Sequence, residues 1–122
     1  MKFAQDHINS KYLIEAYEAG LIRVGGKDYR HNLLLMPDQL KTAWPVASLH
    51  DVQKADLDQL AEQEPDLILF GTGAKQLFLH PKHFSPIINA GIGYEVMPTH
   101  AACRTFNILL AEDRRVLAVL II

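Results

Sequence analysis

A short glycine turn and a helix start are the two segments whose residue types and spacing best suit binding chemistry. Gly71, Thr72 and Gly73 follow one apolar run, and Thr99 follows the next apolar run and a proline. Backbone N–H groups at a glycine turn and at a helix N-terminus both favour a bound anion. If these segments lie side by side, the pattern predicts a crevice for a phosphate or a carboxylate.

Further polar residues lie close enough in sequence to join this predicted crevice. Ligands of open α/β sheets bind at the carboxyl ends of the strands, where both segments would stand. The structural alternative is that the glycines only permit a tight turn, that Thr99 only caps its helix and that Arg104 is solvated. The full candidate set is Gly71, Thr72, Gly73, Glu95, Thr99, His100, Arg104 and Asn107.

Other reactive residue types complete neither a catalytic nor a metal-binding set at a recognisable spacing. Glu95 has no nucleophile or second carboxylate beside it, as a general acid or base would need. His80 and His83, with His100 as a third ligand, lack the Glu or Cys that would complete a zinc or nickel site. We therefore predict no catalytic residue, no metal and no cofactor, and leave an enzyme that acts in the crevice as the alternative.

Cys103 is the single cysteine, which excludes a disulfide framework and indicates a reducing compartment. Two interpretations of its side chain stay open. A position near a helix start would lower its pKa and make the thiol reactive. Its alanine neighbours, Ala101 and Ala102, instead indicate a small residue packed in the core.

Length and charge indicate one small soluble domain over residues 1–122, with residues 1–10 as a loose arm. The net charge is −2 and the pI is about 6.3, which disfavours nucleic acid as a partner. The longest apolar run, 116–122, is far short of the about 20 residues of a membrane helix. No signal-peptide pattern opens the chain, so we expect a cytoplasmic protein without membrane insertion.

Hydrophobic periodicity predicts a β-meander followed by a βαβαβ segment. The meander covers 12–35, with 29–35 as its third strand and an extended piece at 44–46. A change of period after Asp51 predicts a helix that ends before Pro65. The predicted elements that follow are a strand at 67–70, a helix at 83–89 with Ser85 as a candidate cap, a strand at 94–97, a helix from Thr99 and a strand at 116–122.

Two sequence features bear on partners. The apolar run at 116–122 is either a buried strand or an edge that a partner strand or a second copy would extend. Tyr12, Tyr17 and Tyr29 in the predicted meander are of a type enriched at interfaces.

Residues 66–120 resemble a family of adipogenesis-associated and mitochondrial complex I assembly-factor domains that has many bacterial members. The resemblance extends, more loosely, to Gly20, Tyr29 and Trp44 in the first half. The residues that carry it are Pro65, Gly71-Thr72-Gly73, Gly91, Glu95, Met97-Pro98-Thr99, Ala102, Thr105, Asn107, Leu109 and Glu112-Asp113-Arg114.

The resemblance implies a three-layer α/β fold with a mixed central sheet and no established enzymatic activity. Mitochondrial members of the family act as assembly factors through protein contacts, whereas this chain shows no mitochondrial targeting pattern. Our first hypothesis is therefore a non-enzymatic protein-interaction module with another protein as partner and a homodimer as an alternative. The second is a protein that binds a small anion in the 71–73 and 99–104 crevice.

Overall fold

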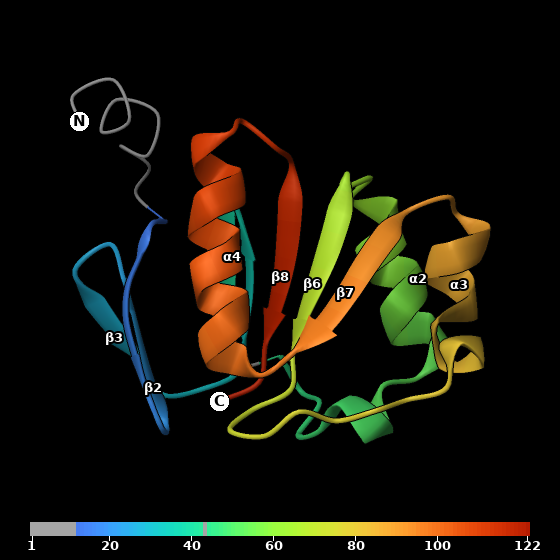
Figure 1. Ribbon diagram of the computed structural model, residues 1–122, viewed down its shortest axis with the longest axis horizontal. Coiled ribbons are helices and arrows are strands. Elements are labelled where there is room, and N and C mark those ends of the chain that lie inside the picture. The colour runs from blue at the N-terminus through green and yellow to red at the C-terminus, as the bar shows by residue number, and fades with distance from the viewer. Residues whose placement is uncertain (1–11, 43) are drawn as a thin grey trace.

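The computed structural model describes residues 12–42 and 44–122, which form a three-stranded and a five-stranded β-sheet (Figure 1). The arm expected at residues 1–10 lies outside the described residues. In chain order the elements are β1 (Ile14–Glu18), β2 (Leu21–Val24), β3 (Lys27–Tyr29), β4 (Leu33–Met36), β5 (Gln39–Thr42), the 3-10 turn η1 (Leu49–Asp51), α2 (Lys54–Glu62), β6 (Leu67–Gly71), the 3-10 turn η2 (Pro81–Phe84), α3 (Ser85–Asn89), β7 (Gly93–Met97), α4 (Thr99–Ala111) and β8 (Val116–Leu120).

The five-stranded sheet has the order β5-β4-β8-β6-β7. β8 runs parallel to β6 and antiparallel to β4, and β6 runs parallel to β7. All five residues of β8 are buried, as expected for a strand that is covered on both faces. The interpretation of the run at 116–122 as a buried strand is therefore confirmed for its β8 portion, and the interpretation as a sheet edge is wrong.

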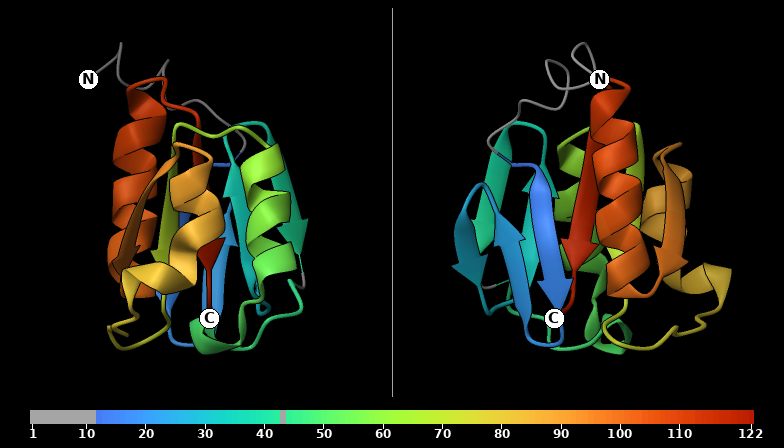
Figure 2. Two further views of the ribbon diagram at one scale, coloured as in Figure 1. Left: turned by 90° about the vertical axis from the view of Figure 1, so that its right-hand side faces the viewer. Right: turned by 60° about the vertical axis from the view of Figure 1, so that its left-hand side comes forward.

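Two hydrophobic clusters on opposite faces of this sheet build the three layers (Figure 2). One cluster joins the sheet to α4 and to the small sheet β1-β2-β3, through residues such as Ile14, Ile22 and Phe106. The other joins the opposite face to α2 and α3, through residues such as Leu57, Leu60 and Ile87. The three-layer α/β fold with a mixed central sheet and an N-terminal antiparallel sheet is thus confirmed.

The predicted third strand of the meander, 29–35, is two strands in different sheets. β3 ends at Tyr29, and β4 pairs with β5 and β8 in the large sheet. Leu33 and Leu35 are fully buried because β4 lies between two strands and beneath the small sheet. The extended piece predicted at 44–46 is not a strand, since the chain pairs earlier, as β5.

The helix predicted at 83–89 is shorter, with a 3-10 turn, η2, before it. Ser85 opens α3, and its hydroxyl donates to the C=O of Lys82 in that turn, so it is not an N-cap. Pro86 lies in the first turn, and Gly91 follows the helix with a φ of 74°, both as predicted.

Candidate functional site

The glycine turn and the start of α4 lie side by side, as predicted. β6 and β7 are parallel neighbours, with Gly71 opposite Met97. The N–H of Thr72 donates to the C=O of Met97 at 2.9 Å, and the N–H of Thr99 donates to the C=O of Gly73 at 2.9 Å. Backbone pairing therefore continues from the strands into the loops that follow them.

The buried Thr99 side chain links the glycine turn to the start of α4. We call this meeting point the junction. Thr99 is 0% exposed; its Oγ1 accepts from the N–H of Gly73 at 2.8 Å and donates to the C=O of Ile121 at 2.6 Å. The N-cap position belongs to Pro98, with no side-chain cap. The prediction that Thr99 caps its own helix is thus wrong, because its hydroxyl instead links the start of α4 to the turn after β6 and to the segment after β8.

Gly71 and Gly73 require glycine for different structural reasons. Gly73 has a φ of 101°, a conformation that favours glycine, so the tight-turn alternative holds at this position. Gly71 has almost no free space: an added Cβ would lie 2.9 Å from Thr99 Oγ1 and 3.2 Å from the Cβ of Ala102. Because Gly73 donates its N–H to Thr99, that amide is already satisfied, and anion binding at this turn stays a prediction.

The other residues predicted for the crevice lie in two different places. His100, Arg104 and Asn107 line a shallow hollow of about 330 Å³ between α4 and β1. Asn107 accepts from the N–H of Ile14 at 3.0 Å and donates to its C=O at 2.7 Å, which fixes β1 against α4. Glu95 is exposed on β7. The structure therefore groups Gly71, Thr72, Gly73 and Thr99, and separates the remaining four residues from them.

Cys103 is 5% exposed in the cluster beneath the small sheet, which confirms core packing. Burial raises the pKa of the Cys103 thiol from its usual 9.0 to about 12. The interpretation as a reactive thiol with a lowered pKa is therefore wrong.

We expect Cys103 to resist alkylation in the folded protein. Iodoacetamide at pH 8 should react at least about a hundredfold more slowly with the native chain than with the urea-unfolded chain, because the thiolate is the nucleophile. The folded-state pKa is raised, so the stability linked to this thiol is full below about pH 9.0 and is lost as the pH rises towards 12. Equal rates in the two states would contradict the buried, neutral thiol.

The histidines considered for a metal site do not converge. His80 precedes η2 as its N-cap, and its Nδ1 accepts from the N–H of Lys82. The His83 ring packs edge-on against Phe84. His100 lies on the exposed face of α4. Within residues 12–42 and 44–122, no group of three or more His, Cys, Asp or Glu side chains is placed to hold a metal ion.

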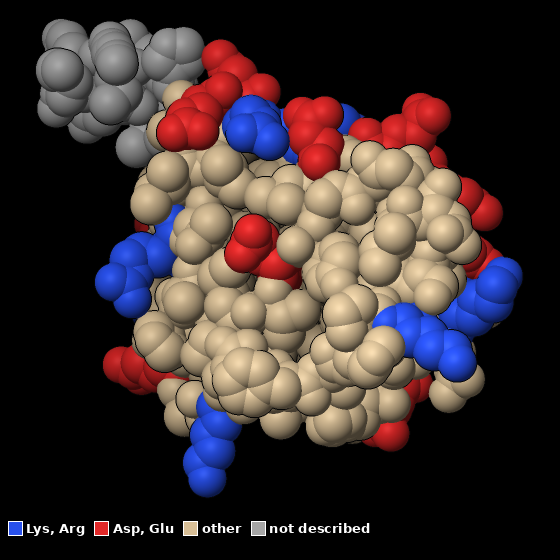
Figure 3. Space-filling view, turned by 45° about the vertical axis from the view of Figure 1, so that its right-hand side comes forward, with Lys and Arg blue, Asp and Glu red and all other residues tan. Residues whose placement is uncertain are grey.

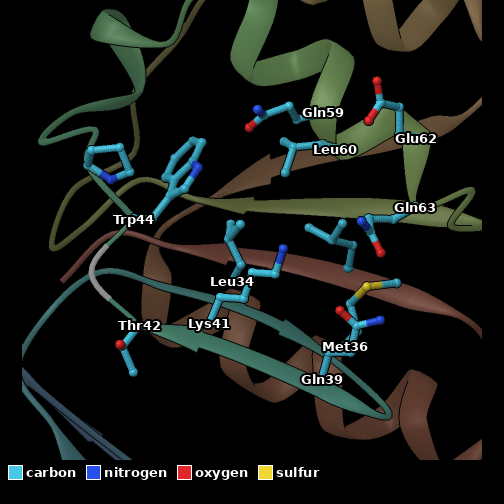
Figure 4. Close-up of a pocket in the computed structure, with 12 residues that line it drawn as sticks. Leu34, Met36, Gln39, Lys41, Thr42, Trp44, Gln59, Leu60, Glu62 and Gln63 are labelled. Carbon is cyan, nitrogen blue, oxygen red and sulfur yellow. The ribbon is translucent and has the colours of Figure 1, made fainter.

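A cavity of about 410 Å³ lies between α2 and the β4–β5 hairpin (Figure 4). This volume is in the range of small-molecule sites. Its floor is apolar and comes from the sheet, its roof comes from α2, and Trp44 stands at one end. The lining residues are Leu34, Met36, Gln39, Lys41, Thr42, Trp44, Pro45, Gln59, Leu60, Glu62, Gln63 and Leu117.

Sequence reasoning missed this cavity because it missed β5. The available signal was the Pro37-Asp38 pair between two short segments, which is typical of a turn that joins two strands. Gln39 and Lys41 alternate with Leu40 and so share the face that looks towards α2.

Comparison with known proteins gives relatives over the full length of the fold. A "13 kDa major membrane protein" of Francisella tularensis is 29% identical over 122 residues, which cover 99% of each chain. The NADH dehydrogenase (ubiquinone) 1 alpha subcomplex assembly factor 3 of Danio rerio is 38% identical over 64% of this chain, and the match spans only 46% of the relative's length.

A crystal structure of a Bordetella parapertussis protein has the same fold, with a TM-score of 0.82 and 37% sequence identity over 91% of this chain and 95% of that one. Among the described residues, no helix is long and apolar enough to span a bilayer. The family model described as "Protein of unknown function (DUF498/DUF598)" matches residues 14–121. That match confirms the resemblance on which the fold prediction rested, and the chain belongs to this family.

Proposed function

We propose that this chain is a non-enzymatic protein-interaction module of the assembly-factor type. Support comes from the relatives named as assembly factors, one of which is 38% identical over 64% of this chain. The observation that carries the proposal is the open edge strand β7, whose one charged residue is Glu95, together with an exposed isoleucine on each of the helices α3 and α4. We call this part of the surface the β7 face and define it by Ile88, Gly93–Met97 and Ile108.

β7 is an edge strand, since the described residues place no further strand beyond it. The C=O of Met97 points to the β6 side, where it accepts from Thr72, so the backbone of Val96 faces outward. The side-chain amide of Gln76 donates to the C=O of Val96 at 3.1 Å and covers that end of the edge. The outward backbone groups of Tyr94 are left without a strand partner and favour an added extended segment.

Large apolar side chains are exposed on the two helices beside this edge. Ile108 on α4 is 57% exposed and Ile88 on α3 is 47% exposed, and the view onto the β7 edge shows these helices on either side of the strand (Figure 2). Figure 3 looks towards this side and shows a broad uncharged area with one acidic group within it and most charges around the rim. Depletion of charge in the centre is characteristic of protein interfaces.

The occupant that suits this surface is an extended apolar segment of a different protein. An added strand would satisfy the backbone of Tyr94, and apolar groups of the partner beyond that strand would cover the exposed Ile88 and Ile108 on the neighbouring helices. Glu95 is the one charged residue of β7, and it would attract a basic group of the partner.

We expect Ile108→Glu to reduce partner recovery at least about tenfold when the tagged chain is captured from its own cells, because a charge would replace an exposed apolar side chain of the β7 face. Ala55→Glu is the matched control, since it adds the same charge to an exposed position of α2. A photoactivatable residue at position 108, compared with one at position 55, shows whether the captured protein contacts the β7 face.

Two results would contradict this proposal. If the Ile108→Glu and Ala55→Glu variants recover equal amounts of the partner, the β7 face is not part of the interaction. In sedimentation of the pure chain, a dimer that Ile108→Glu abolishes would make a second copy the occupant in place of a different protein. Circular dichroism of each variant confirms that the fold is retained.

A further inference from the structure

The cavity between α2 and β5 is at the opposite edge of the sheet from the β7 face, and its chemistry is different. Its floor is formed by Leu34, Met36 and Leu117, and Leu60 descends from α2 towards them. Met36, Leu60 and Leu117 are buried, whereas Leu34 and Trp44 are only partly buried. The apolar surface that a ligand can reach is therefore that of Leu34 and Trp44. A ligand with an apolar body gains by covering it.

Lys41 supplies a positive charge at this apolar surface. The side chain is exposed, and Figure 4 shows its ammonium directed towards the middle of the lining residues. Lys41 makes no ion pair with any of the described residues. The charge is therefore available for an anionic group of a ligand, and it would oppose a cationic one.

Glu62 is the other charged lining residue, and it does not neutralise Lys41. It belongs to the helix wall, and Figure 4 shows its carboxylate directed away from the sheet. The nearby Arg115 is also occupied, because its guanidinium donates to the C=O of Gln63 at 3.1 Å and pairs with Asp38 at 3.8 Å. Lys41 is therefore the cation that faces the cavity.

Polar and aromatic groups complete the site. The side-chain amides of Gln39 and Gln63 stand on opposite walls, where each can donate a hydrogen bond to a carboxylate. Trp44 presents its ring at one end, and aromatic faces pack well against an aliphatic chain or a second ring.

We propose that this cavity binds a small amphipathic carboxylate, with the carboxylate at Lys41 and the apolar body on the floor between Leu34 and Trp44. An uncharged apolar molecule would leave the Lys41 ammonium without a counter-charge. A basic amphiphile would place two positive charges together. The proposal does not depend on the protein-interaction function of the β7 face.

Trp44 makes the site directly observable, because the chain has a single tryptophan and therefore one indole N–H signal in a nitrogen-15 NMR spectrum. The probes are octanoate, octanol and octylamine, which share a chain length and differ in the head group. Octanoate should shift the indole signal and the side-chain amide signals of Gln39 and Gln63 to saturation. Octylamine should leave them in place.

Lys41→Gln should weaken octanoate binding about tenfold, the effect of losing one charge-assisted hydrogen bond. Lys27→Gln is the matched control, because Lys27 is an exposed lysine of the small sheet. Leu34→Phe, which fills the floor, should also weaken binding. The proposal is overturned if octanoate causes no saturable shift, or if octanol binds as tightly and Lys41→Gln changes nothing.

Discussion

Replacing Gly71 with valine should lower the free energy of unfolding by about 3 kcal/mol, the upper end of the cost of overpacking a core. The first added carbon would lie 2.9 Å from Thr99 Oγ1, 3.1 Å from Thr99 Cα and 3.2 Å from the Cβ of Ala102. One of these atoms is backbone and the others are fixed at the start of α4. Relief therefore requires α4 to move away from β6.

Urea unfolding followed by circular dichroism measures this effect. Gly93→Ala is the control, because its added carbon would meet only the end of the Leu67 side chain, at 3.4 Å, and the C=O of Asp66, at 3.9 Å. We expect this control to change stability by no more than about 0.5 kcal/mol. If Gly71→Val unfolds at the same urea concentration as the parent chain, the close packing of β6 and α4 is not a constraint.

Replacing Thr99 with valine should also cost about 3 kcal/mol, although the two side chains have nearly the same shape. The change leaves the N–H of Gly73 and the C=O of Ile121 buried without their partner. Each unsatisfied group costs about 1–3 kcal/mol. The loss comes from hydrogen bonding, because the volume of the side chain hardly changes.

Thr99→Ser separates the hydroxyl from the methyl group. The serine variant retains both hydrogen bonds, so it should lose only about 1 kcal/mol for the methyl group. Thr105→Val is a second control on the same helix, since its hydroxyl donates within α4 to the C=O of Ala101. Equal losses for Thr99→Ser and Thr99→Val would show that the methyl group, and not the hydroxyl, stabilises the junction.

Local signals predicted the second half of the fold well. Continuous apolar runs indicated β6 and β8. The proline before Thr99 marked the start of α4, and the glycine after Asn89 marked the end of α3. These signals come from residues that are close together along the chain, so a single sequence is enough to find them. The first half was less predictable, because the choice of β4 between two sheets is decided by pairing with β8, far away along the chain.

The candidate site was also only partly predictable, because some of its contacts join segments that are far apart in the sequence. The meeting of Gly71 and Gly73 with Thr99 followed from the order of two parallel strands. The direction of each side chain did not follow, because it depends on what packs against it. Arg104 and Asn107 lie on the face of α4 that meets β1, and no local sequence pattern predicts this contact. The cavity beside Trp44 required a strand that was not predicted.

The central position of β8 has a consequence for how the chain folds during synthesis. β5 and β4 on one side, and β6 and β7 on the other, are joined only through β8. All four of those strands precede residues 116–120 in the chain, so the two half-sheets cannot be joined until β8 has been made, and the edges of β4 and β6 that β8 will pair with stay open until then. Joining them closes a loop between β4 and β8 that includes most of the chain, which raises the contact order and slows folding. Unpaired strand edges of this kind make a partly folded chain prone to aggregation until β8 pairs with both half-sheets.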